Sequence, residues 1–102
     1  MSNRQLSEKH REAIRWVSAL RSGRYKQVRN VTKTDDGHCA VAVYYAEVGN
    51  NIEYYLESLT ELFGYPILSN VIRMNDSHNN TFPEIADFLE RELLGELLKV
   101  EA

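Results

Sequence analysis

Two polar clusters hold the side chains of this 102-residue sequence that are best suited to ligand chemistry. One is Arg73 with Asn75 and Asp76, and the other is the run Arg24-Tyr25-Lys26-Gln27. Arginine contacts phosphate and tyrosine stacks on bases, while asparagine and glutamine hydrogen-bond to base edges. If the fold brings the two clusters together, they would form a polar pocket of nucleotide size. The candidate ligand-binding residues are therefore Arg24, Tyr25, Gln27, Arg73, Asn75 and Asp76.

The Asn75-Asp76 pair also has a purely structural interpretation, because both side chains stabilise tight turns through local hydrogen bonds. A strongly marked helix start follows this turn. Thr81 and Glu84 have the spacing of a capping box, in which each side chain satisfies a backbone N–H of the first helical turn. Pro83 falls in that first turn, where its missing N–H costs nothing.

The remaining reactive residues do not form a catalytic or metal-binding set. Cys39 follows His38, but neighbours on a strand point to opposite faces, and the apolar run after Cys39 is typical of a buried small residue. The three histidines are scattered, without the paired spacing of metal ligands. The sequence therefore predicts no catalytic residue, no metal site and no cofactor, and a cysteine hydrolase is the weakest alternative considered.

Length and composition fit a single globular domain over residues 1–102. The net charge of −3 argues against a nucleic-acid partner, which would require a basic stripe. One cysteine allows no intramolecular disulfide, and the polar start of the sequence does not resemble a signal peptide. No apolar run approaches the roughly 20 residues of a membrane helix. We expect a soluble cytoplasmic protein without a membrane partner.

Apolar residues at helical spacing predict three long helices, with Trp16 as a core anchor in the first. Asn3 or Ser7 caps the first helix and Asn51 caps the second, while Gly23 ends the first and Gly64 with Pro66 ends the second. The predicted helices span Arg4–Leu20, Asn51–Phe63 and Phe82–Val100.

The one clear strand candidate is Arg24–Lys33, which is rich in valine and tyrosine. The turn signal Asp35-Asp36-Gly37 predicts a hairpin back into His38. Cys39–Val48 fits either a strand or a helix, and we favour a short strand around His38 running into a helix. Ile67–Met74 also fits both. The predicted fold class is α+β, a small and mostly helical domain with a short β-hairpin.

Three patches, taken in order, resemble a family of small uncharacterised proteins from phages, prophages and bacteria. They are Trp16–Gln27, His38–Val43, and Met74–Ser77 together with Phe82–Glu90. The family pattern reads tryptophan–x–x–alanine-leucine-arginine-serine-glycine, then asparagine-aspartate, then phenylalanine–x–x–isoleucine-alanine-aspartate. In the middle patch the family has two adjacent cysteines and a glycine, whereas His38 and Ala42 occupy two of those places here. The family has no established activity, so the resemblance implies an accessory protein of a mobile element.

These observations predict a small accessory protein that acts by binding a host protein, without catalysis. The alternative is a protein that binds or sequesters a nucleotide signal, in an anti-defence role. Tyrosine is favoured at interfaces, and the sequence contains six tyrosines. The final helix also has more leucines than core packing needs, which favours a homodimer or higher homo-oligomer. These leucines are Leu89, Leu93, Leu94, Leu97 and Leu98.

Overall fold

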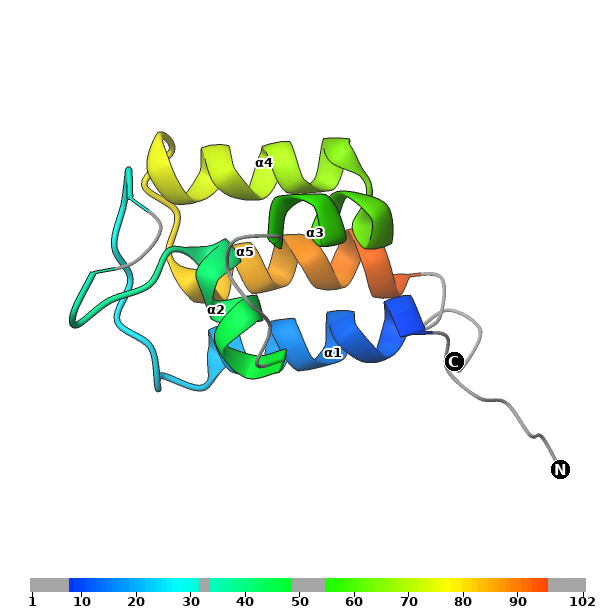
Figure 1. The fold of residues 1–102 in the computed structure, drawn as a ribbon, viewed down its shortest axis with the longest axis horizontal. Coiled ribbons are helices and arrows are strands. Elements are labelled where there is room, and N and C mark those ends of the chain that lie inside the picture. The colour runs from blue at the N-terminus through cyan, green and yellow to red at the C-terminus, as the bar shows by residue number, and fades with distance from the viewer. Residues whose placement is uncertain (1–7, 32–33, 49–54, 96–102) are drawn as a thin grey trace, which may run out of the picture.

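The structure, a computed structural model, describes residues 8–31, 34–48 and 55–95, without the side chains of residues 48 and 55–58. These residues form five α-helices, the last of which passes into a π-helical turn (Figure 1). The elements are α1 (Glu8–Arg21), α2 (Ala40–Val48), α3 (Tyr55–Phe63), α4 (Tyr65–Asp76), α5 (Phe82–Leu89) and η2 (Glu90–Leu94).

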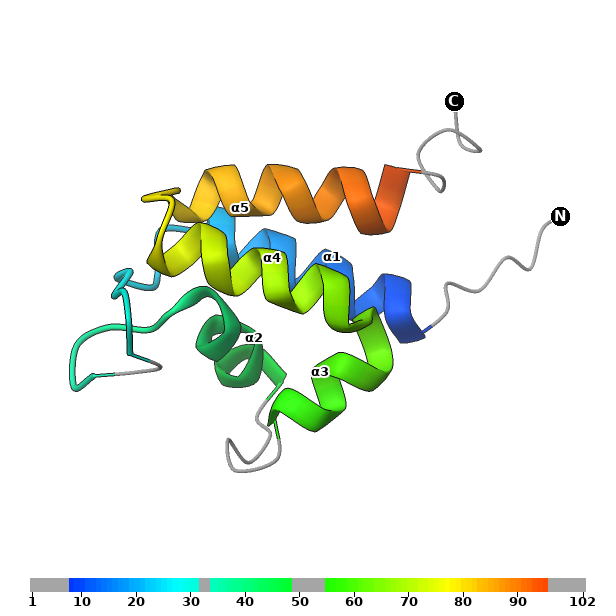
Figure 2. The ribbon, with the colours of Figure 1, turned by 90° about the horizontal axis from the view of Figure 1, so that it is seen from above.

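Helix α1 is the centre of the arrangement, since it packs against α5, η2 and α2. Helix α4 lies against α5, α2 and α3. Because α5 packs against both α1 and α4, these three helices run side by side (Figures 1 and 2). The long connection between α1 and α2 covers the end of this bundle where α4 finishes and α5 begins. Within the described residues, no helix has both the length and the apolar character needed to cross a membrane.

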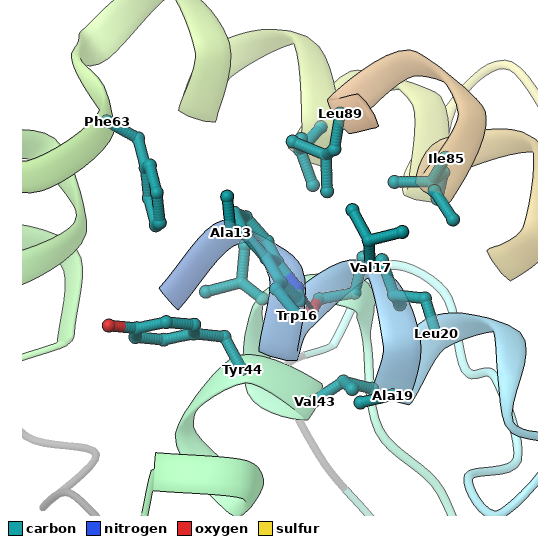
Figure 3. Close-up of a cluster of buried hydrophobic side chains, with 14 of the residues drawn as sticks. Ala13, Trp16, Val17, Ala19, Leu20, Val43, Tyr44, Phe63, Ile85 and Leu89 are labelled. Atoms are coloured by element: carbon teal, nitrogen blue, oxygen red, sulfur yellow. Dashed lines mark hydrogen bonds between the residues drawn. The ribbon is translucent and has the colours of Figure 1, made fainter. Parts of the chain in front are cut away.

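Trp16 anchors the core, as its position in the apolar stripe of the first helix predicts. Its side chain is fully buried among apolar side chains (Figure 3), and its indole Nε1 donates a hydrogen bond of 2.9 Å to the carbonyl oxygen of Ala40. Its ring lies 5.5 Å from the ring of Tyr44 and 5.4 Å from the ring of Phe63, between ring centroids. Trp16 therefore joins α1 to α2 and α3 through both an apolar surface and one polar bond.

Several helix ends agree with the predicted stop signals. Helix α1 ends at Arg21, and Gly23 follows with a φ of 81°, a left-handed conformation that glycine adopts without strain. Gly64, with a φ of 91°, separates α3 from α4, and Pro66 lies in the first turn of α4. The predicted caps Asn3, Ser7 and Asn51 lie outside the described residues, as do residues 4–7, 51–54 and 96–100 of the predicted helices.

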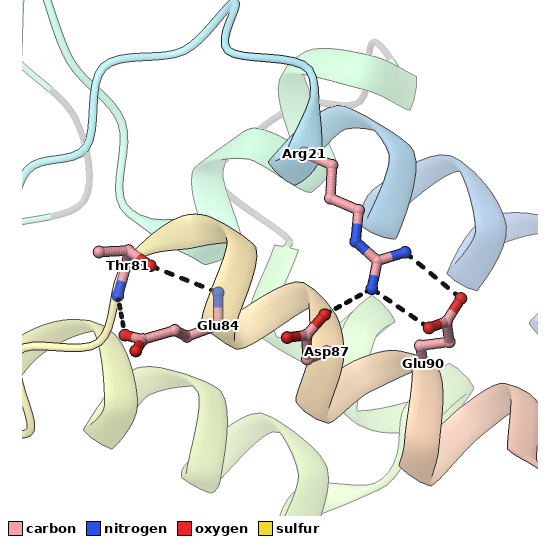
Figure 4. A network of polar contacts seen from close by, with 5 residues as sticks. All are labelled: Arg21, Thr81, Glu84, Asp87 and Glu90. Carbon is pink, nitrogen blue, oxygen red and sulfur yellow. Dashed lines mark hydrogen bonds and ion pairs between the residues drawn. The ribbon is translucent and has the colours of Figure 1, made fainter.

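The capping box at the start of α5 is confirmed. Thr81 Oγ1 accepts a hydrogen bond from the Glu84 amide at 3.4 Å, and the Thr81 amide donates to Glu84 Oε1 at 2.8 Å (Figure 4). The backbone bond from Thr81 lowers the pKa of the Glu84 carboxyl group. Beside this cap, Arg21 of α1 bridges Asp87 at 2.6 Å and Glu90 at 3.2 Å, which ties α1 to α5.

The predicted α+β class with a β-hairpin is wrong. The described residues are mostly helical and contain no sheet. Arg24–Val31 is not a strand, and its only β-type contact is an isolated bridge between Gln27 and His38. This bridge is parallel, whereas the strands of a hairpin are antiparallel.

Both ambiguous segments are helices. Ile67–Met74 lies within α4, and residues 40–48 form α2, so the helical half of our preferred reading of Cys39–Val48 is confirmed. The strand expected around His38 is replaced by the isolated bridge. Residues 40–45 are all buried, so the apolar pattern of α2 follows neither the helical nor the strand period.

Replacing Trp16 by Phe should destabilise the fold by about 2–4 kcal/mol, because the change leaves a void and removes the indole donor to Ala40. Urea unfolding followed by circular dichroism measures the loss. The control is Ile14→Ala on the exposed side of α1, which should change stability by no more than about 0.5 kcal/mol. Equal effects of the two substitutions would show that the indole does not anchor the core.

Candidate functional site

Asn75, at the end of α4, is the centre of the candidate site and is only 1% exposed. Its Oδ1 atom accepts hydrogen bonds from Gln27 Nε2 at 2.9 Å and from the Ala40 amide at 3.1 Å. Its Nδ2 atom donates to the Val28 carbonyl at 2.9 Å and to Asp76 Oδ1 at 2.8 Å. A side-chain amide offers two donors and two lone pairs, so the hydrogen-bonding capacity of Asn75 is filled by the protein itself.

The neighbours of Asn75 hold the same connection between α1 and α2. The guanidinium group of Arg29 donates a hydrogen bond to the backbone carbonyl of Asn75. Asp76 Oδ1 accepts a hydrogen bond of 2.8 Å from the Asn30 amide, and Asn30 has a φ of 65°. Asparagine tolerates this left-handed conformation better than most residues do. Side-chain bonds from α4 therefore replace the strand pairing that the sequence predicts for this segment.

Backbone hydrogen bonds within the connection between α1 and α2 also fix its course. The Val28 amide donates to the His38 carbonyl at 3.0 Å, and the His38 amide donates to the Lys26 carbonyl at 2.8 Å. Gly37 packs so closely here that a Cβ atom would overlap the Val28 side chain and approach the Lys26 carbonyl. We call residues 24–31 and 34–38 the pinned loop, because bonds from α4 and within the loop fix its course.

Arg24 and Tyr25 take part in a different cluster, centred on Glu47 near the end of α2. The Tyr25 hydroxyl donates to Glu47 Oε2 at 2.5 Å, and the Arg24 guanidinium lies 2.9 Å from the same oxygen. The bond from Tyr25 lowers the pKa of Glu47, while burial and that carboxylate raise the pKa of Tyr25. The Tyr25 ring also meets the His38 ring edge to face, with centroids 5.0 Å apart. This cluster holds a phenol against a carboxylate, which stabilises the loop without activating either group.

Arg73 stands apart from both clusters. It is exposed on α4, and its guanidinium group donates to Ser69 Oγ at 3.3 Å. The fold thus brings Gln27, Asn75 and Asp76 together, but no described contact joins Arg24 or Arg73 to Asn75. The six sequence candidates do not enclose one pocket through the contacts of the described residues, and ligand binding by them stays a prediction.

Sequence reasoning missed Glu47 and Ala40. Glu47 lies 22 positions from its partner Tyr25, and Ala40 lies 35 positions from Asn75. Ala40 takes part only through its backbone, which no residue-type pattern can identify. Glu47 is one of 15 acidic residues, and nothing in its neighbourhood distinguishes it from a solvent-exposed glutamate.

Cys39 immediately precedes α2, and its carbonyl accepts the amide of Val43 at 3.1 Å. Burial raises the pKa of the thiol, although backbone amides at the start of α2 act in the opposite direction. The nucleophile of a cysteine enzyme is the thiolate, which a raised pKa disfavours at neutral pH. His38 packs its ring against Tyr25. The surroundings of Cys39 therefore favour a packing role.

A metal centre and an apolar groove are two other kinds of site that a chain of this type can offer. Among the described residues, no group of three or more histidine, cysteine, aspartate or glutamate side chains is placed to hold a metal ion. A groove of about 330 Å³ lies between α3 and α4, away from the Asn75 cluster, and includes none of the six candidates. Its lining residues are Thr60, Tyr65, Leu68, Ser69 and Ile72.

Comparison of the chain with protein-family models, with curated proteins and with solved structures gave no match. The resemblance to the phage and bacterial family therefore stays a prediction based on the three sequence patches.

Replacing Asn75 by Ala should cost about 3 kcal/mol, because the Ala40 amide and the Val28 carbonyl lose a buried partner. Urea unfolding measures the loss, and hydrogen exchange should show faster exchange at Val28 and His38. The control is Asn70→Ala, a half-buried asparagine of the same helix, with an expected change within about 0.5 kcal/mol. Unchanged exchange in the pinned loop would contradict the role given to Asn75.

Cys39 should react slowly with iodoacetamide at pH 7, since only the thiolate reacts and the raised pKa reduces its fraction. The rate should rise with pH and reach half its maximum at a higher pH than in the same protein unfolded in urea, which serves as the control. Mass spectrometry follows the reaction. Faster alkylation of the folded protein at pH 7 would contradict the packing role and favour the hydrolase alternative.

Proposed function

We propose that this protein is a non-catalytic binding protein that recognises another protein through the pinned loop. Given the resemblance to mobile-element proteins, the partner we propose is a host protein, and the compartment is the cytoplasm. The observation that carries the proposal is the buried Asn75, whose side chain bonds to Gln27 and Val28 and so fixes the course of the first half of an exposed loop.

A loop held in this way is suited to recognition. Binding residues are concentrated on loops that a rigid scaffold positions, and a loop already fixed in shape loses less entropy on binding. The pinned loop exposes an apolar side chain, Val31, which is 49% exposed, and it also carries exposed charges of both signs on Lys26, Asp35 and Asp36. A protein interface combines an apolar centre with a polar rim, and the loop offers side chains of both kinds.

The nucleotide alternative has less support. The Asn75 amide is 1% exposed and filled by internal bonds, so it has no capacity left to read a base edge. Arg24 is paired with Glu47, which reduces its value for phosphate. A catalytic function has less support still, because burial disfavours the Cys39 thiolate.

A photo-crosslinking amino acid at Val31 should capture one specific protein from a bacterial lysate. The control carries the same group at Ile14, an apolar residue of α1 that is 41% exposed, and should not capture that protein. The captured protein, identified by mass spectrometry, is then purified and titrated against this chain. Lys26→Glu should weaken that binding about tenfold, since reversing a rim charge opposes the encounter. Equal capture from both positions, or an unchanged affinity for Lys26→Glu, would contradict the proposal.

A further inference from the structure

A second surface, on α4, leaves two large apolar side chains partly uncovered, before and after the buried Leu68. Tyr65, Leu68, Ser69 and Ile72 follow the spacing that places side chains on one face of a helix. Tyr65 is 69% exposed and Ile72 is 39% exposed, although both are large and apolar. These four residues, here called the α4 stripe, line the groove of about 330 Å³ together with Thr60 of α3.

Opposite charges flank the two ends of the α4 stripe. Arg73 is exposed one residue after Ile72, and its guanidinium group donates a hydrogen bond of 3.3 Å to the Ser69 hydroxyl. Glu61 is exposed on α3, four residues before Tyr65 and close to the turn at Gly64 that joins α3 to α4 (Figure 2). Within the described part of the chain, neither residue is paired with an opposite charge. The surface therefore has a positive end, an apolar middle and a negative end.

From this arrangement we propose that the α4 stripe binds the α4 stripe of a second copy, antiparallel, in a symmetric dimer. A two-fold axis between Leu68 and Ser69 places Tyr65 against the partner's Ile72. The same axis brings Arg73 near the partner's Glu61, and by symmetry Glu61 near the partner's Arg73. A surface that matches itself under a two-fold rotation is what an isologous dimer requires. The small Ser69 at the axis lets the two helices approach closely.

The dimer should be weak and concentration-dependent. From Tyr65 to Ile72 the stripe is about 10 Å long at the rise of an α-helix, which is short for a contact surface. Stable complexes usually bury about 800 Å² on each partner. We therefore expect mostly monomer at micromolar concentration and mostly dimer at several hundred micromolar. The surface is separate from the pinned loop, so this proposal does not depend on the proposed function.

Sedimentation equilibrium of the whole chain from about 5 to 500 μM measures the association across this range. Ile72→Glu should make the protein monomeric throughout, because it places a buried charge at the contact. Ile14→Glu on α1 is the matched control, since Ile14 is 41% exposed and lies outside the stripe, and it should leave the association unchanged. Circular dichroism confirms that both variants fold. A monomeric wild type, or equal loss of dimer in both variants, would overturn the proposal.

Charge exchange tests the antiparallel arrangement itself. Arg73→Glu and Glu61→Arg should each weaken self-association about tenfold, because each homodimer then opposes like charges twice. A mixture of the two variants should form heterodimers with an affinity within about threefold of the wild type, since each heterodimer contains two glutamate–arginine pairs. A mixture that associates no better than the separate variants would exclude the pairing of Arg73 with Glu61.

Discussion

The fold depends on how one residue, Ala40, is held at the start of α2. Its amide donates to Asn75 Oδ1 of α4 at 3.1 Å, and its carbonyl accepts from Trp16 Nε1 of α1 at 2.9 Å. The first amides of a helix have no partner inside the helix, and a buried amide without a partner is costly. Asn75 supplies that partner from another helix. The two bonds place the start of α2 between α1 and α4.

Directional bonds matter here because apolar packing alone does not orient α2. Residues 40–45 are all buried, so this part of α2 has no exposed face to distinguish one rotation about its axis from another. The two hydrogen bonds at Ala40 select one rotation of α2 about its axis. The buried side-chain amide of Asn75 also contributes to a unique core, because all of its hydrogen bonds are satisfied. The pinned loop gains its shape from the same amide, through Gln27 and Val28. One asparagine thus fixes both a core helix and an exposed loop.

The parts of this structure that could be predicted from the sequence are those set by neighbouring residues. The Thr81–Glu84 cap and the end of α1 before Gly23 follow from local hydrogen bonds and backbone preferences. The strand predicted for Arg24–Lys33 fails because β-propensity describes a fit to a sheet, and no sheet forms among the described residues. The bonds that shape this segment come from residues 46–48 positions away, and no local pattern contains them. The candidate site was predicted only in part for the same reason. Gln27 hydrogen-bonds to Asn75, as the pocket prediction requires, but Tyr25 hydrogen-bonds to Glu47, which the sequence patterns do not single out.

The two proposed surfaces are related through α4. The last turn of this helix holds Asn75 and thereby the pinned loop, while its first two turns expose Tyr65 and Ile72. The loop lies at the end of α4, so an antiparallel dimer would place its two loops at opposite ends of the paired helices (Figure 1). Two copies of the pinned loop on one dimer can engage a symmetric or repeated partner together. Such bivalent binding raises the effective affinity without any new contact in either loop. A small protein with one modest recognition loop would gain specificity for assembled partners in this way.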